Sequence, residues 1–269
     1  MGLNSKKKKG VRKRSLKRQL PFYLMMAPGL FFIGLLFYLP MPGVILAFKD
    51  YNPVDGLFGS KWVDPLFTNF EFFFKSNDAW VVLRNTLGLN FLFIFCTLVI
   101  SVIIALMLNE VRSRKLVKTT QTIMFFPYFM SWVVVGYLLY AFLHHNFGIL
   151  NNIITFFGGE AVSWYARAEY WPFILTFMYV WKFAGYNSVI YYAGLMGIDS
   201  SYYEAAEIDG ANRWQMIWKI TLPMIKGLII VMLILQIGRI MYADFGLFFQ
   251  LTRDQGALYS TTDVLDTYI

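Results

Sequence analysis

The sequence predicts an all-α integral membrane protein, a polytopic helical bundle with five transmembrane helices. Hydrophobic residues make up 58% of the 269 residues and charged residues only 15%, which is too little polar material to cover a soluble globule of this length. The apolar residues are also gathered into runs of about 20, the length that crosses a bilayer as a helix. These runs lack the alternation over about ten residues that is typical of a transmembrane barrel.

Five segments meet this requirement, and we expect each to be helical because backbone polar groups in lipid must be paired internally. The first three contain charge-free runs long enough to span. The fourth is interrupted by Lys182, and the apolar part of the fifth, from Gly227 onward, is interrupted by Arg239. The expected spans are about 20–48, 85–109, 119–143, 170–198 and 218–243.

A basic tail, residues 1–19, precedes the first span and includes the run KKKKGVRKRSLKR. At this place the tail is expected to hold the N-terminus in the cytoplasm and to contact anionic lipid headgroups rather than nucleic acid. The following apolar run is too long for a signal peptide and ends without a small-x-small cleavage site, so it should remain as an anchor. We expect a multi-pass protein of the cell (plasma) membrane.

The positive-inside rule then orients the loops. Segment 110–118 (EVRSRKLVK) is cationic and falls inside, whereas 49–84 and 144–169 fall outside. Residues 199–217 fall inside as well. The most polar interruption of the second half of the chain is therefore expected at the cytoplasmic surface.

That interruption reads EAAEIDGANRWQMIWKITLP. Ser201 and Glu204 have the capping-box spacing, which predicts a helix from about Tyr202. Gly210 suits a left-handed turn, and Asn212 is expected to start a second short helix at an angle to the first. The first helix is acidic, whereas a helix lying on headgroups has a basic polar face, so a protein partner is favoured over a lipid surface.

The spacing E-A-A, three residues, G, nine residues, I-x-L-P resembles the EAA loop of permease subunits in bacterial binding-protein-dependent ABC importers. The longer form EAAxIDGANRWQ is similar to the LplB-like group within the maltose-type permeases, which handles oligo- and polysaccharides. A weaker likeness covers the stretches PFYLMMAPGLFFIGLLFYLPM and WKFAGYNSVIYYAGLMGID. The resemblance implies a type I ABC importer permease fold over residues 20–269, with a cytoplasmic coupling loop at 199–223. It also implies a sixth span, which would follow residue 269.

The resemblance further implies a function and a set of partners. The chain would be the membrane-spanning subunit of an ATP-driven importer and would form half of the translocation path. It implies a second permease subunit, two cytoplasmic ABC ATPase subunits, an extracytoplasmic solute-binding protein and a saccharide, beside membrane lipid. The ATPase-coupling residues it implies are Glu204, Ala205, Ala206, Asp209 and Gly210.

The sequence contains no G-x-x-x-x-G-K-[ST], so ATP is expected on the partner subunits and no cofactor is expected in this chain. It also contains no H-E-x-x-H and no G-x-S-x-G, which argues against an enzyme. Cys96 is expected to be a packing residue. The pair His144–His145 is expected in an interfacial loop rather than in a metal site, because no further ligands accompany it.

A cation inside a membrane needs a partner or a wet cavity, which makes Lys182 and Arg239 candidates for the substrate path. Each shares a helical face with a polar neighbour. For Lys182, lining the path and pairing with a carboxylate of a partner subunit both remain open. For Arg239, outward snorkelling or pairing with Asp244 is favoured over lining. The full predicted path set is Trp181, Lys182, Tyr186, Asn187, Gln236 and Arg239.

Two other function classes fit the sequence less well. A stand-alone secondary transporter driven by an ion gradient should show inverted repeats and intramembrane acids, and neither is seen in the sequence. A membrane-anchored enzyme or assembly factor would need an extramembrane domain, and the outer loops are too short for one. The importer subunit is therefore preferred.

Overall fold

The computed structural model describes the backbone of residues 9–268 and the side chains of residues 19–71 and 73–268. The first eight residues of the predicted basic tail therefore lie outside the described residues. The chain divides into two compact units, residues 1–76 and 77–269, and each is described by itself.

The first unit is dominated by one long apolar helical stretch. Helix α1 (Lys9–Ile33) continues through a π turn, η1 (Gly34–Tyr38), into a 3₁₀ helix, η2 (Met41–Phe48). Its 30-residue portion Gln19–Phe48 is long and apolar enough to cross a membrane. This portion agrees with the first expected span.

A small hairpin follows the first span. Strands β1 (Lys49–Asp50) and β2 (Lys61–Trp62) pair antiparallel, with the short helix α2 (Gly56–Gly59) between them. The Lys49 ammonium donates to the carbonyl oxygens of Leu57 and Phe58 at 2.9 and 3.0 Å, which fixes the helix against the strand.

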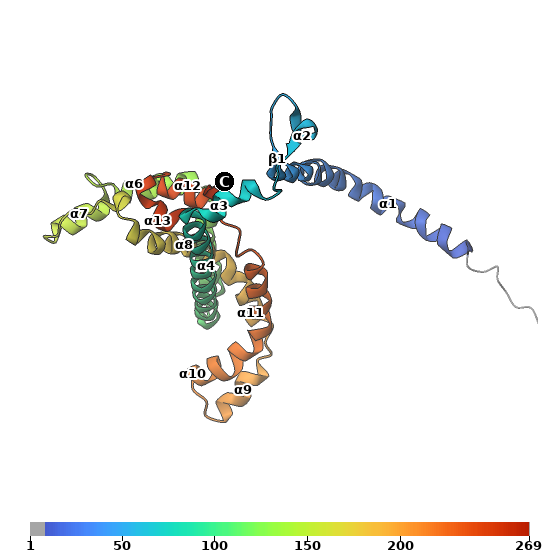
Figure 1. Cartoon of the computed structure of the whole chain (residues 1–269). Helices are drawn as coiled ribbons and strands as arrows, with labels where there is room; N and C mark the ends of the chain where they lie inside the picture. The colour runs from blue at the N-terminus through green and yellow to red at the C-terminus, as the bar shows by residue number, and fades with distance from the viewer. Residues whose placement is uncertain (1–8, 269) are drawn as a thin grey trace, which may run out of the picture. The chain divides into compact units, whose positions relative to one another are not determined.

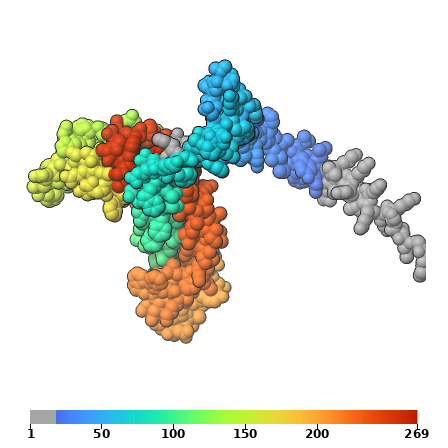
Figure 2. All heavy atoms as spheres, viewed as in Figure 1, coloured from blue at the N-terminus to red at the C-terminus, as the bar shows by residue number. Residues whose placement is uncertain are grey.

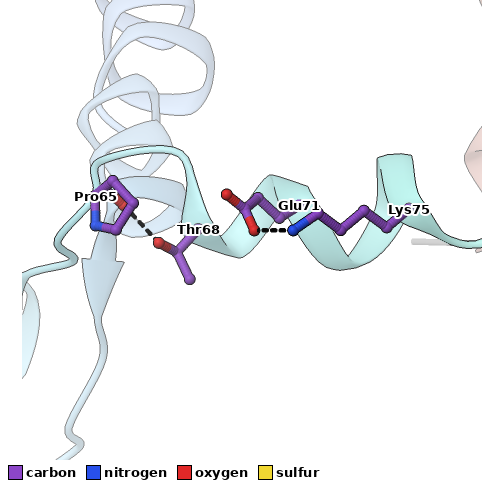
Figure 3. Close-up of polar contacts among 4 residues, drawn as sticks. All are labelled: Pro65, Thr68, Glu71 and Lys75. Atoms are coloured by element: carbon purple, nitrogen blue, oxygen red, sulfur yellow. Dashed lines mark hydrogen bonds and ion pairs between the residues drawn. The ribbon is translucent and has the colours of Figure 1, made fainter.

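Helix α3 (Thr68–Lys75) ends the first unit and is stabilised by its own side chains. The Thr68 hydroxyl donates to the carbonyl oxygen of Pro65 at 2.7 Å, and Lys75 Nζ lies 2.6 Å from Glu71 Oε2 one turn earlier (Figure 3). Both groups of the ion pair are exposed, so the pair contributes little to the stability of the fold.

The second unit is built on two long helices, α4 (Asn77–Glu110) and α8 (Trp171–Leu195), which pack along their length. The rings of Phe93 and Tyr179 stack at 4.5 Å, and further along both helices the Ser101 hydroxyl donates to the Ala184 carbonyl at 3.1 Å. The two helices therefore run in the same direction. This is the relation that the alternating topology requires of the second and fourth expected spans.

The third expected span is not one straight helix. Residues 114–143 form α5 (Arg114–Phe129) and α6 (Trp132–Leu143), which meet at a bend of 95°. At the break the Ser131 side chain accepts from the Val134 N–H at 3.3 Å and so starts a new helix. The expected helix over 119–143 is therefore broken within the apolar run, because the Ser131 cap starts a new helix there.

The coupling-loop region contains α9 (Ser201–Ile208) and α10 (Arg213–Met216). The second of these does not stand alone: it continues through a π turn, η5 (Ile217–Thr221), into α11 (Leu222–Ile237). Arg213–Ile237 is thus one 25-residue membrane-length helix, and the expected angle lies only at the turn between α9 and α10. Helix α11 ends at Ile237, so Arg239 follows the helix rather than lying inside it.

Within the described residues, three helices are long and apolar enough to span a membrane, or four if α5 and α6 form one span. Helix α8 has the length but not the mean hydropathy, since it carries Lys182, several tyrosines and Asn187. The fold is therefore mostly helical and membrane-compatible, but the expected count of five is not confirmed.

The remaining elements of the second unit gather at the end opposite to α9 and α10 (Figure 1). Gly136 on α6 makes the close packing there possible, because a Cβ at this position would lie 2.6 Å from the carbonyl oxygen of Gln250. These elements are α7 (Ile149–Phe156), η3 (Trp164–Ala166), η4 (Ala168–Tyr170), α12 (Phe245–Thr252), η6 (Gly256–Leu258), α13 (Tyr259–Thr262) and α14 (Leu265–Tyr268).

The same constraint applies at Gly185, where α8 touches the backbone of α5 at Met124. We predict that Gly185→Ala destabilises the protein by roughly 1–3 kcal/mol, because backbone atoms must move to admit the methyl group. Each kcal/mol lowers the apparent melting temperature by about 2–4 °C. Thermal unfolding in detergent measures this, with Gly88→Ala as control because a Cβ there meets nothing within 4 Å. Equal melting temperatures for the two variants would contradict the prediction.

Candidate functional site

Helix α9 begins at Ser201, one residue before the expected start, and is preceded by Ser200 without a side-chain cap. The predicted capping box between Ser201 and Glu204 does not form. Instead the Asp199 carboxylate accepts from the Ser201 backbone N–H at 2.9 Å. That backbone hydrogen bond holds the pKa of Asp199 below its usual value. The charged carboxylate is thereby favoured at the N-terminus of the helix, where the helix dipole stabilises a negative charge.

The turn after α9 has the geometry that the sequence predicts. Gly210 lies in the left-handed region at φ +78°, where residues with a Cβ are strained. Asn212 and Gln215 then form a complete capping box: the Asn212 side chain accepts from the Gln215 N–H at 2.9 Å, and the Gln215 side chain accepts from the Asn212 N–H at 2.8 Å. The direction of α10 relative to α9 is thus set by local interactions.

Two contacts fasten this loop to the membrane helices. The hydroxyl groups of Tyr203 and Thr221 lie 3.0 Å apart and join α9 to the π turn that leads into α11. Arg213 Nη1 lies 3.5 Å from Glu110 Oε2 at the end of α4. A cavity of about 240 Å³ lies between these elements. The first contact links α9 to the helix that continues as α11, and the second links α10 to α4.

The outer surface of the loop is open, and Figure 2 shows it as the projecting end of the second unit. Of the predicted coupling residues, Ala206 is half-buried and the other four, Glu204, Ala205, Asp209 and Gly210, are exposed. Large apolar side chains stand beside them: Ile208 is 86% exposed, Trp214 71% and Trp218 65%. This mixture of carboxylates and bare apolar groups is typical of a protein contact surface.

A groove of about 510 Å³ lies in the second unit among α4, α5, α8, α11 and the segment that follows α11. Four of the predicted path residues line it together, namely Tyr186, Asn187, Gln236 and Arg239. The other residues that line it are Asn90, Phe93, Ile94, Tyr128, Tyr179, Phe183, Met232, Leu235, Tyr242, Asp244 and Leu247.

The other two predicted path residues lie elsewhere. Trp181 borders a separate, almost wholly apolar cavity of about 580 Å³ between α6, α7 and α8. Lys182 is only 6% exposed and donates to backbone carbonyls at the α5–α6 break. Neither of the two alternatives weighed for this residue anticipated that arrangement.

The groove offers flat aromatic faces and amide groups to a solute. Tyr128 and Tyr186 are stacked at 4.2 Å with an interplanar angle of 6°, and Tyr186 is 39% exposed. Tyr179 and Phe183 precede Tyr186 by seven and three residues, which places all three on one helical face. This spacing was the signal in the sequence that could have identified Tyr179 and Phe183. Tyr128 could not be identified, because it comes from another helix.

Some polar side chains at the groove already have hydrogen-bond partners within the protein. The Asn90 side chain donates to the Ile240 carbonyl at 2.9 Å and ties α4 to the segment after α11. Asp244 accepts from Trp132 Nε1 at 2.6 Å and from the first N–H groups of α12. Arg239 is exposed. Within residues 9–268 no group of three or more His, Cys, Asp or Glu side chains is placed to hold a metal ion.

Comparison with known proteins places this geometry in a family context. Residues 97–249 match the family described as binding-protein-dependent transport system inner membrane component. The chain is 37% identical to Protein LplB of Bacillus subtilis (strain 168), over 95% of this chain and 79% of that protein. It is also 37% identical to the polygalacturonan/rhamnogalacturonan transport system permease protein YteP of the same organism, over 97% and 81%.

Solved structures of ABC transporter subunits are also similar to this chain. One similar chain belongs to a bacterial ABC transporter involved in the import of the acidic polysaccharide alginate, with a TM-score of 0.84 and 34% identity over 95% of this chain and 84% of that chain. Another belongs to the alginate transporter in complex with an alginate pentasaccharide-bound periplasmic protein, with a TM-score of 0.83 and 34% identity over 95% and 83%.

The Asn212 side chain caps the first turn of α10. Asn212→Ala removes the cap of α10 and should cost about 1 kcal/mol of local stability. Amide exchange at Gln215 should then be about fivefold faster, since 1 kcal/mol corresponds to about that factor. Hydrogen-exchange mass spectrometry of peptides covering 210–218 measures the change. Unaltered protection in these peptides would show that the cap is not formed in solution.

Proposed function

Because the chain belongs to the family of binding-protein-dependent transport system inner membrane components, we propose that it forms half of the translocation path for oligo- or polysaccharides in an ATP-driven importer. Members of this family are permease subunits of ABC transporters and are not enzymes. The chain is a sugar permease of this kind in a multi-pass, inner-membrane setting.

The observation that carries the proposal is the groove lined by Tyr128, Tyr186, Asn187, Gln236 and Arg239. Aromatic faces pack against the apolar faces of sugar rings, and amide groups bond to hydroxyl groups. A groove that held only aliphatic side chains would suit lipid instead. Similar proteins carry names for arabinooligosaccharides, polygalacturonan and alginate, which supports oligosaccharides and polysaccharides as the substrate class.

The loop of residues 199–223 is proposed to dock on an ABC ATPase subunit. Its support is the exposed surface of Glu204, Ala205, Asp209 and Gly210 with the bare apolar side chains beside them. The small side chain of Ala205 and the turn at Gly210 permit close approach of a partner. The contacts of Tyr203 and Arg213 provide a mechanical route from this surface to α11 and α4.

The proposed assembly contains a second permease subunit, two cytoplasmic ATPase subunits and an extracytoplasmic solute-binding protein. A similar transporter has been solved with a periplasmic protein that holds a saccharide, which supports the last of these partners. The proposed orientation has the N-terminus and residues 199–217 in the cytoplasm, because the cations of residues 6–18 and 110–118 favour that side. A stand-alone secondary transporter is not favoured, since the family consists of binding-protein-dependent systems.

The coupling proposal is tested by Gly210→Val. A β-branched residue at φ +78° is strained by roughly 1–2 kcal/mol, so the turn and the direction of α9 should change. We expect at least a tenfold loss of ATPase subunit co-isolated in mild detergent, with unchanged membrane insertion. Glu204→Lys, which reverses one exposed charge, should give a smaller loss in the same direction.

The control for both variants is Glu160→Lys, which reverses an exposed charge outside this loop and should leave co-isolation unchanged. If ATPase still co-isolates with the Gly210→Val and Glu204→Lys proteins at the wild-type ratio, residues 199–223 are not the docking surface.

The path proposal is tested by Asn187→Leu, which replaces an amide at the groove by an apolar group of similar size. We expect uptake of labelled alginate or galacturonate oligosaccharides by whole cells to fall at least fivefold, with normal co-isolation of ATPase. Asn152→Leu, an exposed position on α7, is the matched control. Wild-type uptake in the Asn187 variant would remove this residue from the path.

A further inference from the structure

The break between α5 and α6 exposes backbone carbonyls in an apolar setting. The last four carbonyl groups of a helix have no partner within the helix, and in hydrocarbon no water replaces that partner. The chain turns by 95° at this break, so the carbonyls of the last turn of α5 cannot bond to α6. The Pro127 carbonyl accepts from the Met130 N–H at 3.2 Å, and a donor from another element can serve the other carbonyls of this turn.

Lys182 of α8 is that donor. Its ammonium group donates to the carbonyl oxygens of Pro127 and Tyr128 at 3.2 and 3.1 Å, and to that of Met130. An ammonium group has three N–H donors, and these three carbonyls account for all of them. The group is therefore committed to the backbone and has no donor left for a solute. A positive charge also interacts favourably with the C-terminal end of a helix.

One of the three bonded carbonyls belongs to Tyr128, whose side chain lines the groove. Tyr128 gives its carbonyl to Lys182, while its ring stacks on Tyr186 and meets Phe183 edge-on at 5.9 Å. Tyr186 comes from α8, one turn after Lys182. The stacked pair is thus a contact between two helices whose relative position Lys182 fixes.

On its other side the ammonium group faces an indole ring. Lys182 Nζ lies 4.9 Å from the centroid of the Trp132 ring, and Trp132 Nε1 donates to Asp244 Oδ2 at 2.6 Å. The face of an aromatic ring attracts cations, whereas its N–H edge attracts anions. The face of the Trp132 ring therefore meets the ammonium group, and its N–H edge meets the carboxylate. Asp244 in turn caps α12 and lines the groove.

We propose that Lys182 is a positioning residue of the translocation groove: by binding the carbonyls at the α5–α6 break and the face of Trp132, it sets the positions of Tyr128, Tyr186 and Asp244. This rests on the proposed path function of the groove. Lys182 contacts no solute in this arrangement. It acts through the backbone of α5 and through the Trp132–Asp244 hydrogen bond.

The test uses the importer complex purified from its native host and reconstituted with its binding protein. Lys182→Met keeps the length of the side chain and removes all three donors. Lys182→Arg keeps a cation and N–H donors. The probes are the alginate pentasaccharide and an oligogalacturonate, and the readout is the number of saccharide molecules moved per ATP hydrolysed.

We expect Lys182→Met to lower this ratio at least fivefold while the amount of co-isolated ATPase stays unchanged, and Lys182→Arg to lose less. Lys226→Met, at an exposed cation of α11, is the matched control and should retain the wild-type ratio. An unchanged ratio in Lys182→Met, or equal losses in the Met and Arg variants, would overturn the proposal.

A second measurement separates positioning from stability. Spin labels at the exposed positions Ile123 of α5 and Val134 of α6, in a Cys96→Ser background, report the distance across the break. Lys182→Met should broaden or shift this distance distribution, whereas a residue that only adds stability would leave it as in the wild type.

If Lys182→Met does not accumulate, Trp132→Phe carries the test, because it keeps a ring over the ammonium and loses the N–H bonded to Asp244. It should lower the ratio, and a wild-type ratio would overturn the proposal.

Different results would contradict the path function of the groove and the positioning role of Lys182. If the wild-type complex moves neither saccharide with ATP, the proposed path function fails, and the spin-label distances still decide whether Lys182 holds the break. If the wild type transports while Lys182→Met keeps both the ratio and the distances, only the positioning role fails.

Discussion

Every backbone amide and carbonyl placed in hydrocarbon must find a partner inside the protein, and this constraint shapes the chain more than any other. It explains why the apolar segments are helices and why each interruption carries its own polar partner. At the α5–α6 break the partner is the ammonium group of Lys182, and at the end of α11 the Ile240 carbonyl is met by the Asn90 amide. Lys182 and Asn90 lie within α8 and α4, and each bonds to a carbonyl at a place where another helix stops.

Close backbone contact is the second organising feature. Glycines at 136 and 185 let α12 and α5 approach their neighbours more closely than a residue with a Cβ would permit. Because hydrophobic burial gives no net drive between helices in lipid, such contacts and interhelical hydrogen bonds provide the specificity of packing. The groove lies beside these tightly packed points, so its shape depends on the positions of few contacts.

Helices α11 and α4 connect the loop to the groove. Helix α11 begins beside the loop, where Tyr203 contacts Thr221, and near its other end Gln236 lines the groove. Helix α4 likewise meets Arg213 at Glu110 and reaches the groove at Asn90. Two helices, α11 and α4, thus run from the contacts of α9 and α10 to the groove. This connectivity supports the proposal that docking at residues 199–223 alters the path.

The sequence by itself determined the helical membrane class, the left-handed turn at Gly210 and the family, because these depend on composition, local backbone preference and a gap-free motif. Tyr186, Asn187, Gln236 and Arg239, which the sequence predicts for the path, line one groove, and the members of each pair are close along the chain. Only the tertiary structure decided the bend at Ser131, the end of α11 before Arg239 and the role of Lys182. These depend on which carbonyls a distant side chain can reach, and hydropathy carries no information about that.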